Sequence, residues 1–194
     1  MLAAGGCSAS GTESAHTEPS VIAPGKPGEA NRTLSAEDAA DQRADDNSPN
    51  TADRSYVVMM ISHHSQALEM TGLVPERAQS AQVKGIAERI SAAQGPEIAA
   101  MKGWLATNGK GGEAHHHHGA MPGMATDAQL TELRAAEGKA FDRLFLKLMI
   151  AHHQGAVSMA TDVKAQGNNI QIEEMADDVI AQQTSEIVRM RGML

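Results

Sequence analysis

The chain has 194 residues, of which 41% are hydrophobic, so it has room for one ordinary domain with a buried core. The net charge of −8, with no stripe of basic residues, argues against a nucleic-acid partner. Twelve methionines stand against two Phe, one Tyr and one Trp, which predicts a core of aliphatic and thioether side chains.

The first 50 residues are expected to lie outside the folded domain. Cys7, in "LAAGGCSASG", resembles the lipidated cysteine at the end of a bacterial lipoprotein signal, which implies an extracytoplasmic protein on a lipid anchor. The charged start of such a signal is absent from this sequence, so a free thiol in a flexible tail is the alternative. Residues 8–50 have almost no large apolar side chains, which predicts a disordered tether over 1–50.

The first helix is predicted from Tyr56 to about Gly72, where Pro75 follows. Its apolar residues recur at steps of four and three, which is typical of a helix that buries one face. That face consists of Tyr56, Met60, His63, Ala67 and Met70.

A second helix is predicted to bury a face that runs from Val83 to Trp104 and includes Gln94, Glu97 and Met101. Gly95-Pro96 interrupts it, and since proline removes a backbone hydrogen bond, we expect a kink there.

Both helices occur twice, because residues 142–194 repeat residues 53–105 without a gap at a constant offset of 152 − 63 = 89 residues. This internal duplication predicts two helical hairpins related by a pseudo-two-fold axis. Gly167 is expected to end the first repeated helix in the left-handed conformation. Thr184-Ser185 replace Gly95-Pro96, so the second repeated helix should be straighter.

The crossover between the copies, residues 106–141, is rich in Gly and His at first. His115 to His118, with Met121 and Met124 after them, are a candidate ion-collecting loop, or a solvated loop with incidental affinity. Thr126 and Gln129 then form a capping-box pattern that opens a short helix ending near Gly138. Residues 51–194 are therefore predicted to form an all-α, ferritin-like four-helix bundle of two duplicated hairpins plus a short extra helix.

Polar residues on the buried faces predict a polar layer inside this bundle. His63 and His152 should point inward, with Gln94, Glu97, Gln183 and Glu186 facing them from the second helices. His64 and His153 lie one residue off the seam and are expected nearer the flank or surface. Because burial of unpaired polar groups costs several kcal/mol, the layer must either hydrogen-bond internally or hold a metal ion.

Methionines flank this layer at helical spacing: Met60, Met70, Met101, Met149, Met159 and Met190. Thioethers prefer Cu(I) and imidazoles accept both copper states, so copper is the expected metal, with zinc and iron still open. A di-iron bundle would need Glu-x-x-His, but Ala100 and Arg189 stand where those histidines would be. The alternative is that the methionines are flexible core side chains.

With these residues assembled, the chain resembles the bacterial family called domain of unknown function 305, whose repeats carry M-x-x-H-H-x-x-A-x-x-M and then Q-x-x-E-I-x-x-M. "MMISHHSQALEM" with "QGPEIAAM", and "LMIAHHQGAVSMA" with "QQTSEIVRM", are close to that pattern. The resemblance implies a ferritin-like bundle, export from the cytoplasm and, for some members, copper binding. It implies no enzymatic activity.

Three functions remain open from the sequence: Cu(I) sequestration or delivery, a ferritin-like metal oxidase, and a structural bundle with a buried hydrogen-bond network. The expected partners are a metal ion, a membrane reached only through the lipid anchor and an unknown protein that receives the metal. A second copy of the chain, in a homodimer, is a further option.

Overall fold

The structure, a computed structural model, describes residues 20–23, 30–39, 47–109 and 121–194, which fall into two compact units, 1–46 and 47–194. In the first unit, β1 (Ser20–Ala23) pairs antiparallel with β2 (Arg32–Ser35), and Val21 faces Leu34. A helical turn follows over 36–39. We predicted no regular structure here, but the β-branched Val21, Ile22 and Thr33 favour strands. The role of residues 1–50 as a tether stays a prediction.

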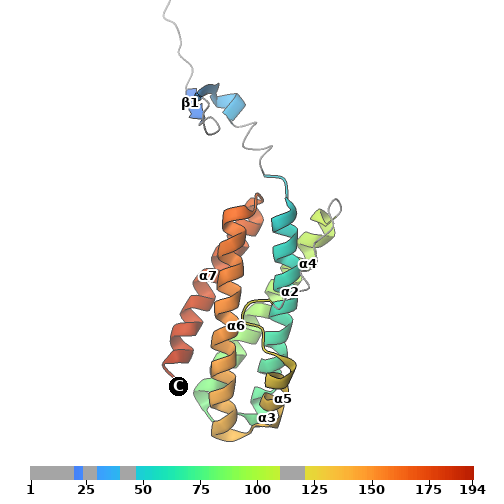
Figure 1. Ribbon diagram of the computed structural model, residues 1–194, viewed down its shortest axis with the longest axis vertical. Helices are drawn as coiled ribbons and strands as arrows, with labels where there is room; N and C mark the ends of the chain where they lie inside the picture. Colours follow the sequence, from blue (N-terminus) through green and yellow to red (C-terminus); the bar gives the residue numbers. More distant parts are fainter. Residues whose placement is uncertain (1–19, 24–29, 40–46, 110–120) are drawn as a thin grey trace, which may run out of the picture. The chain divides into compact units, whose positions relative to one another are not determined.

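The second unit is helical (Figure 1). Its helices are α2 (Thr51–Gly72), α3 (Val74–Arg77), α4 (Ala81–Asn108), α5 (Asp127–Ala135), α6 (Gly138–Gln166) and α7 (Ile170–Arg191). α2 packs against α4, α6 packs against α7, and the two hairpins meet through α2 and α6, whereas α4 and α7 pack little against each other. The predicted helical fold is confirmed, whereas the internal duplication of the hairpins and the closed ferritin-like bundle stay predictions. None of the helices in the described ranges is long and apolar enough to cross a membrane.

The predicted capping box of α5 is present, because the Thr126 and Gln129 side chains each accept from the other residue's backbone N–H. α5 ends at Ala135, and Gly138, with φ of 59°, is the first residue of α6. The helix α4 is unbroken through Pro96, and the predicted kink at this residue stays a prediction.

The prediction that Gly167 adopts the left-handed conformation is wrong. It ends α6 with φ of −74° and ψ of 167°, which is extended backbone. Glycine is needed here because of close approach: a Cβ atom would lie 2.4 Å from Asp53 Oδ1 and 2.8 Å from the Val163 carbonyl oxygen.

Two buried aspartates join the hairpins. Asp53 at the start of α2 accepts the backbone N–H groups of Asn168 at 3.1 Å and Asn169 at 3.2 Å, in the loop between α6 and α7. Asp142 near the start of α6 accepts those of Gln79 and Ser80, before α4, at 3.1 and 2.9 Å. Each copy's aspartate therefore holds the interhelical loop of the other copy.

The apolar core consists of two clusters of buried side chains. One includes Tyr56, Met60, Met101 and Met159; the other includes Met70, Phe145, Met149 and Met190. The duplication exchanges these two sets, since Tyr56 corresponds to Phe145 and the three methionines of each set correspond to those of the other. The structure therefore sorts the six core methionines predicted as ligands into two trios, Met60, Met101 and Met159, and Met70, Met149 and Met190.

Removing the acceptor at Asp53 tests the contact between the hairpins. Asp53→Ala should lower the free energy of unfolding by about 3 kcal/mol, because buried N–H groups lose a charged acceptor. Asp177→Ala is the control: this exposed carboxylate pairs with Lys164, and its loss should cost less than about 1 kcal/mol. Urea unfolding of both variants measures the difference, and equal losses would contradict this role for Asp53.

Candidate metal centre

Four fully buried histidines form a polar layer where α2 and α6 meet, between the two apolar clusters. His63 of α2 and His152 of α6 lie face to face, with ring centroids 3.7 Å apart and planes tilted by 35°. Their predicted inward orientation is correct.

His64 and His153 are as deeply buried as their neighbours, so the expectation that they lie nearer the surface is wrong. The reason is that α2 packs on two sides, against α6 and α4. Successive helical residues point about 100° apart, so His63 meets α6 while His64 meets α4. His153 likewise reaches α7.

Three of the four imidazoles donate a hydrogen bond from Nε2 to an acceptor on another element. His64 donates to Glu97 Oε2 and His153 donates to Glu186 Oε2, each at 2.7 Å. His63 donates to the carbonyl oxygen of Pro122 at 3.1 Å. The predicted imidazole–carboxylate pairing is therefore present, but through His64 and His153, and sequence reasoning missed the carbonyl partner of His63.

The Nδ1 atoms of all four histidines are buried and have no hydrogen-bond partner among the described residues, and neither ring nitrogen of His152 has one there. When Nε2 carries the proton, Nδ1 of a neutral imidazole has a free lone pair. Histidines that bind metals commonly donate their other N–H to a carboxylate or a backbone carbonyl, as three of these do. The layer thus presents oriented nitrogen donors that nothing in the described residues uses.

Other polar atoms of the layer are also unpartnered. Both side-chain polar atoms of Gln94, Gln183 Oε1 and Glu186 Oε1 are buried without a hydrogen bond. Such atoms are rare in folded proteins and indicate bound water or an ion. The layer therefore has more atoms with free lone pairs than an internal hydrogen-bond network among the described residues uses.

Burial lowers the pKa of His63 to about 4, although its bond to the Pro122 carbonyl opposes the shift and His64 and His153 add to it. Burial also lowers the pKa of His152 to about 2, helped by the neighbouring His63. Both side chains are neutral at pH 7, which is the form that binds a metal ion.

The end of the crossover lies against the layer. Gly155 of α6 is needed because a Cβ atom there would lie 1.9 Å from the Pro122 carbonyl oxygen. The side chain of Gln66 anchors Ala125, accepting its N–H at 2.7 Å and donating to its carbonyl at 2.9 Å. Met121 and Met124 are half-buried, and Met121 packs against the cluster of Tyr56. His115 to His118 and Cys7 lie outside the described residues.

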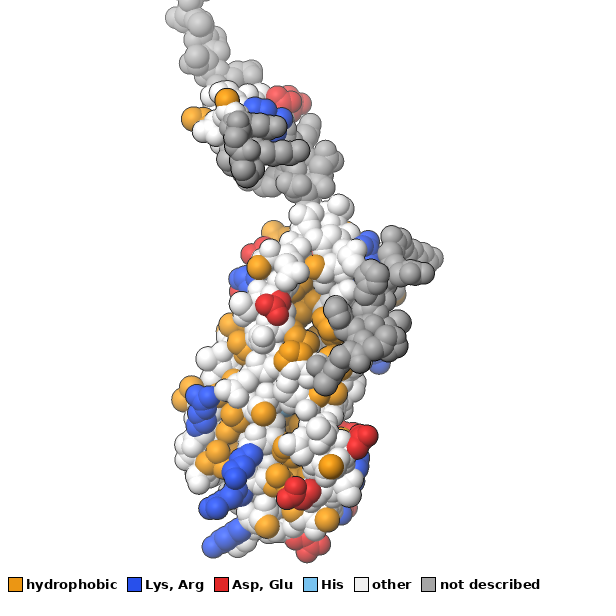
Figure 2. All heavy atoms as spheres, in the orientation of Figure 1, with side chains coloured by type: hydrophobic (Ala, Val, Ile, Leu, Met, Phe, Trp, Pro, Cys, Tyr) orange, Lys and Arg blue, Asp and Glu red, His pale blue; other side chains and the backbone are white. Residues whose placement is uncertain are grey.

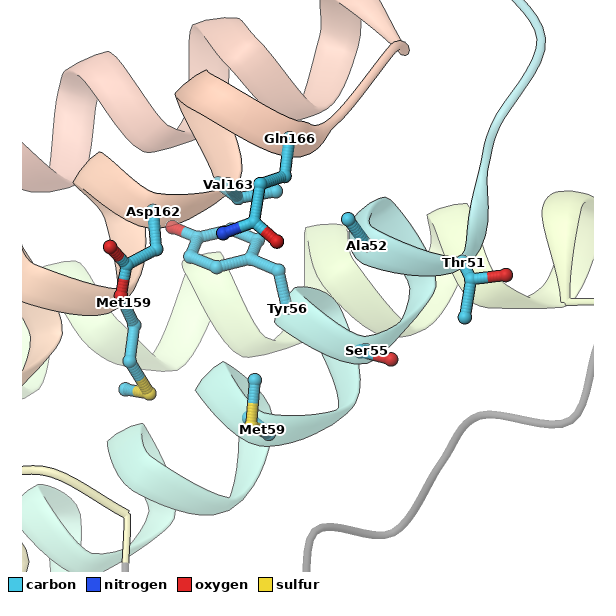
Figure 3. Close-up of a pocket in the computed structure, with 9 residues that line it drawn as sticks. All are labelled: Thr51, Ala52, Ser55, Tyr56, Met59, Met159, Asp162, Val163 and Gln166. Atoms are coloured by element: carbon cyan, nitrogen blue, oxygen red, sulfur yellow. The ribbon is translucent and has the colours of Figure 1, made fainter.

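Two clefts open beside Tyr56. One, of about 730 Å³ between α2 and α6, is lined by Met59, Met159 and Asp162 among others. Figure 3 shows the Tyr56 ring reaching from α2 towards α6 in this cleft. The other, of about 550 Å³, is lined by residues of α4 and α7 that include Glu97 and Met101. The Tyr56 hydroxyl, which is buried, has no hydrogen-bond partner.

The two carboxylates of the layer differ in exposure. The side chain of Glu97 is 27% exposed and that of Glu186 is 3% exposed. Within the described residues, no group of three or more His, Cys, Asp or Glu side chains is close enough to hold a metal ion.

The sequence model of a family described as a domain of unknown function (DUF305) matches residues 53–194. The chain belongs to the DUF305 family. A Streptomyces coelicolor DUF305 protein described as a candidate secreted protein is 32% identical, with TM-score 0.67, covering 74% of this chain and 90% of that one. A DUF305 fragment from Deinococcus radiodurans is 30% identical, with TM-score 0.67, covering 75% and 97%.

The Cu(I)-bound form of CopM is 33% identical to this DUF305 chain, with TM-score 0.61, covering 73% of this chain and 94% of that one. CopM has also been solved in Cu(II)-bound and Ag-bound forms. A comparison with curated proteins finds no match.

The lowered pKa values predict how stability depends on pH in the metal-free protein. Because folding holds His63 and His152 neutral, the unfolded state binds more protons below pH 6.5, and stability should fall as pH falls. For each histidine, the slope should rise from about 0.7 kcal/mol per pH unit at pH 6.5, where the unfolded imidazole is half protonated, towards about 1.4 kcal/mol per pH unit near pH 5.

Urea unfolding at several pH values measures this slope. His152→Leu should remove about half of it, whereas Gln183→Leu, a change at a buried residue that does not titrate, should leave it intact. A slope that His152→Leu does not alter would contradict burial of a neutral imidazole.

Proposed function

We propose that this protein binds copper as Cu(I) outside the cytoplasm, for sequestration or delivery, through the histidines of the layer and the methionines of the two clusters beside it. The observation that carries the proposal is the set of four buried Nδ1 atoms without partners, three of them on imidazoles held from Nε2. The Cu(I)-bound form of CopM supports the choice of metal. The neighbour described as a candidate secreted protein supports the location.

The methionine trios support a soft ion. Met60 precedes His64 by one helical turn, and Met149 precedes His153 in the same way, so a thioether and an Nδ1 atom lie on one face of each helix. Both methionines are fully buried. Sulfur and imidazole nitrogen together suit Cu(I), whereas Mg²⁺ and Ca²⁺ prefer oxygen.

Glu97 and Glu186 act in this proposal as partners that orient the imidazoles. Each occupies the Nε2 side of a histidine and leaves the Nδ1 side to the metal. Their negative charge also offsets the charge of a bound cation, because no Lys or Arg forms an ion pair with either one in the described residues.

Replacing thioethers by a side chain of similar volume tests the ligands. In a Cys7→Ser background, which removes the thiol, Met60→Leu and Met149→Leu together should weaken Cu(I) binding more than about tenfold, while stability changes by less than about 1.5 kcal/mol for each substitution. Competition with a Cu(I) chelator measures the affinity. Met193→Leu, at a partly buried methionine outside both trios, is the matched control.

Failure of the Cys7→Ser protein itself to compete with the chelator, with its helical circular dichroism intact, would overturn the proposed function. Equal affinity in the Met60→Leu/Met149→Leu protein and the control would remove these two thioethers from the site. His63→Ala and His152→Ala are expected to weaken Cu(I) binding as well. Deletion of His115 to His118 should remove only weak sites.

The glutamates provide a separate prediction. Glu186→Gln should weaken Cu(I) binding about ten- to hundredfold, because loss of an orienting carboxylate typically changes metal affinity by this factor. The apo protein should lose little stability, since glutamine can still accept from His153 Nε2. Glu174→Gln, an exposed residue of α7, is the control. Unchanged affinity in Glu186→Gln would leave Glu186 a purely structural residue.

A further inference from the structure

The cleft between α4 and α7 combines soft, acidic and buried polar groups. Its lining includes Tyr56, Glu97, Ala100, Met101, Met175 and Asp178. Two thioethers and two carboxylates thus face a space of about 550 Å³, and among its lining residues there is no Lys or Arg. The unpartnered hydroxyl of Tyr56, a residue only 2% exposed, also belongs to this lining.

The internal duplication supplies a comparison for this cleft. The corresponding residues of the other copy are Phe145, Glu186, Arg189, Met190, Ile86 and Arg89. Hence Ala100 corresponds to Arg189, Met175 to Ile86 and Asp178 to Arg89. A cation would meet Arg189 and Arg89 beside Glu186 at the second place, but two carboxylates and no arginine at the first.

Positive charge on the surface lies elsewhere. Figure 2 shows Lys and Arg side chains, together with some Asp and Glu, towards the end of the helical unit where α6 begins and α7 ends. A cleft of about 470 Å³ is lined by Lys139, Arg143 and Lys147, with Glu132 beside them. These residues belong to α5 and α6, so this cleft shares no lining residue with the α4–α7 cleft.

The α4–α7 cleft also connects to the layer through one residue. Glu97 lines the cleft and accepts from His64 Nε2 at 2.7 Å. Met101 lines it too and belongs to the cluster that contains Met60 and Met159. The corresponding carboxylate of the second copy, Glu186, is buried, with its side chain 3% exposed.

We propose that the α4–α7 cleft is the access site through which a soft monovalent cation, Cu(I) or Ag(I), reaches the histidine layer. Glu97 and Asp178 attract the ion, and Met101 and Met175 replace part of its hydration with thioether sulfur. This inference rests on the proposed function. It adds that the ion reaches the layer beside Glu97 of the first copy and not beside Glu186 of the second. The α2–α6 cleft is the alternative route, with Asp162, Met59 and Met159 in its wall.

Blocking the cleft with the other copy's residue tests the route. Ala100→Arg copies Arg189 and should slow Cu(I) transfer from a chelator, and its return, about tenfold, with unchanged stoichiometry and affinity. The matched control is Ala99→Arg, which adds the same charge at an exposed neighbour that does not line the cleft. Stopped-flow transfer to the Cys7→Ser protein of 194 residues, with Ag(I) as a second probe ion, measures the rates.

Charge gives a second comparison. Asp178→Asn should slow binding several-fold at low salt and less at high salt, because attraction of a cation to surface carboxylates is screened by salt. Asp162→Asn in the α2–α6 cleft should leave the rate unchanged.

The outcomes separate the two proposals. Absence of Cu(I) binding in the Cys7→Ser parent protein would overturn the proposed function. Normal equilibrium binding with equal rates in Ala100→Arg and Ala99→Arg would overturn the access route alone. A rate that falls in Asp162→Asn but not in Asp178→Asn would assign access to the α2–α6 cleft instead.

Discussion

Burial of four imidazoles at the contact between α2 and α6 constrains the rest of the helical unit. A buried polar group without a partner costs several kcal/mol, so the rings need acceptors from other elements, and three of the four have one. α4 supplies Glu97, α7 supplies Glu186, and the crossover supplies the Pro122 carbonyl. These acceptors explain why Gly155 must lack a side chain, since the crossover has to approach α6 closely to reach His63.

Because of the duplication, the same pattern of residues supplies both halves of this arrangement. Each copy contributes two histidines, one glutamate and three methionines, and the contact through α2 and α6 mixes them, so each methionine trio contains members from both copies. Asp53 and Asp142 fasten the same contact by capping each other's loops. Separation of the hairpins would therefore expose both the apolar clusters and the aspartates' hydrogen bonds.

Periodicity was sufficient to predict the helices, the hairpin duplication and the inward orientation of His63 and His152. It failed for His64 and His153, because a single seam describes a helix with one neighbour and α2 has two. Local chemistry predicted the Thr126 cap, since the partners are three residues apart. The Gly167 conformation and the Pro122 contact depend on residues more than fifty positions away in sequence, which no local pattern reports.

Charge connects the layer to the inequality between the copies. In the layer two carboxylates accept from His64 and His153, and no Lys or Arg pairs with either carboxylate in the described part of the chain. Burial holds His63 and His152 neutral by lowering the pKa of both. Glu97 is partly solvated, whereas Glu186 is enclosed and has one oxygen without a partner. A cation in the layer would offset the enclosed charge, and a monovalent ion with sulfur and nitrogen ligands loses less hydration energy on burial than a divalent one. In the proposed route, the ion enters beside the partly solvated Glu97. Its charge then stabilises the enclosed carboxylate of Glu186 more than that of Glu97.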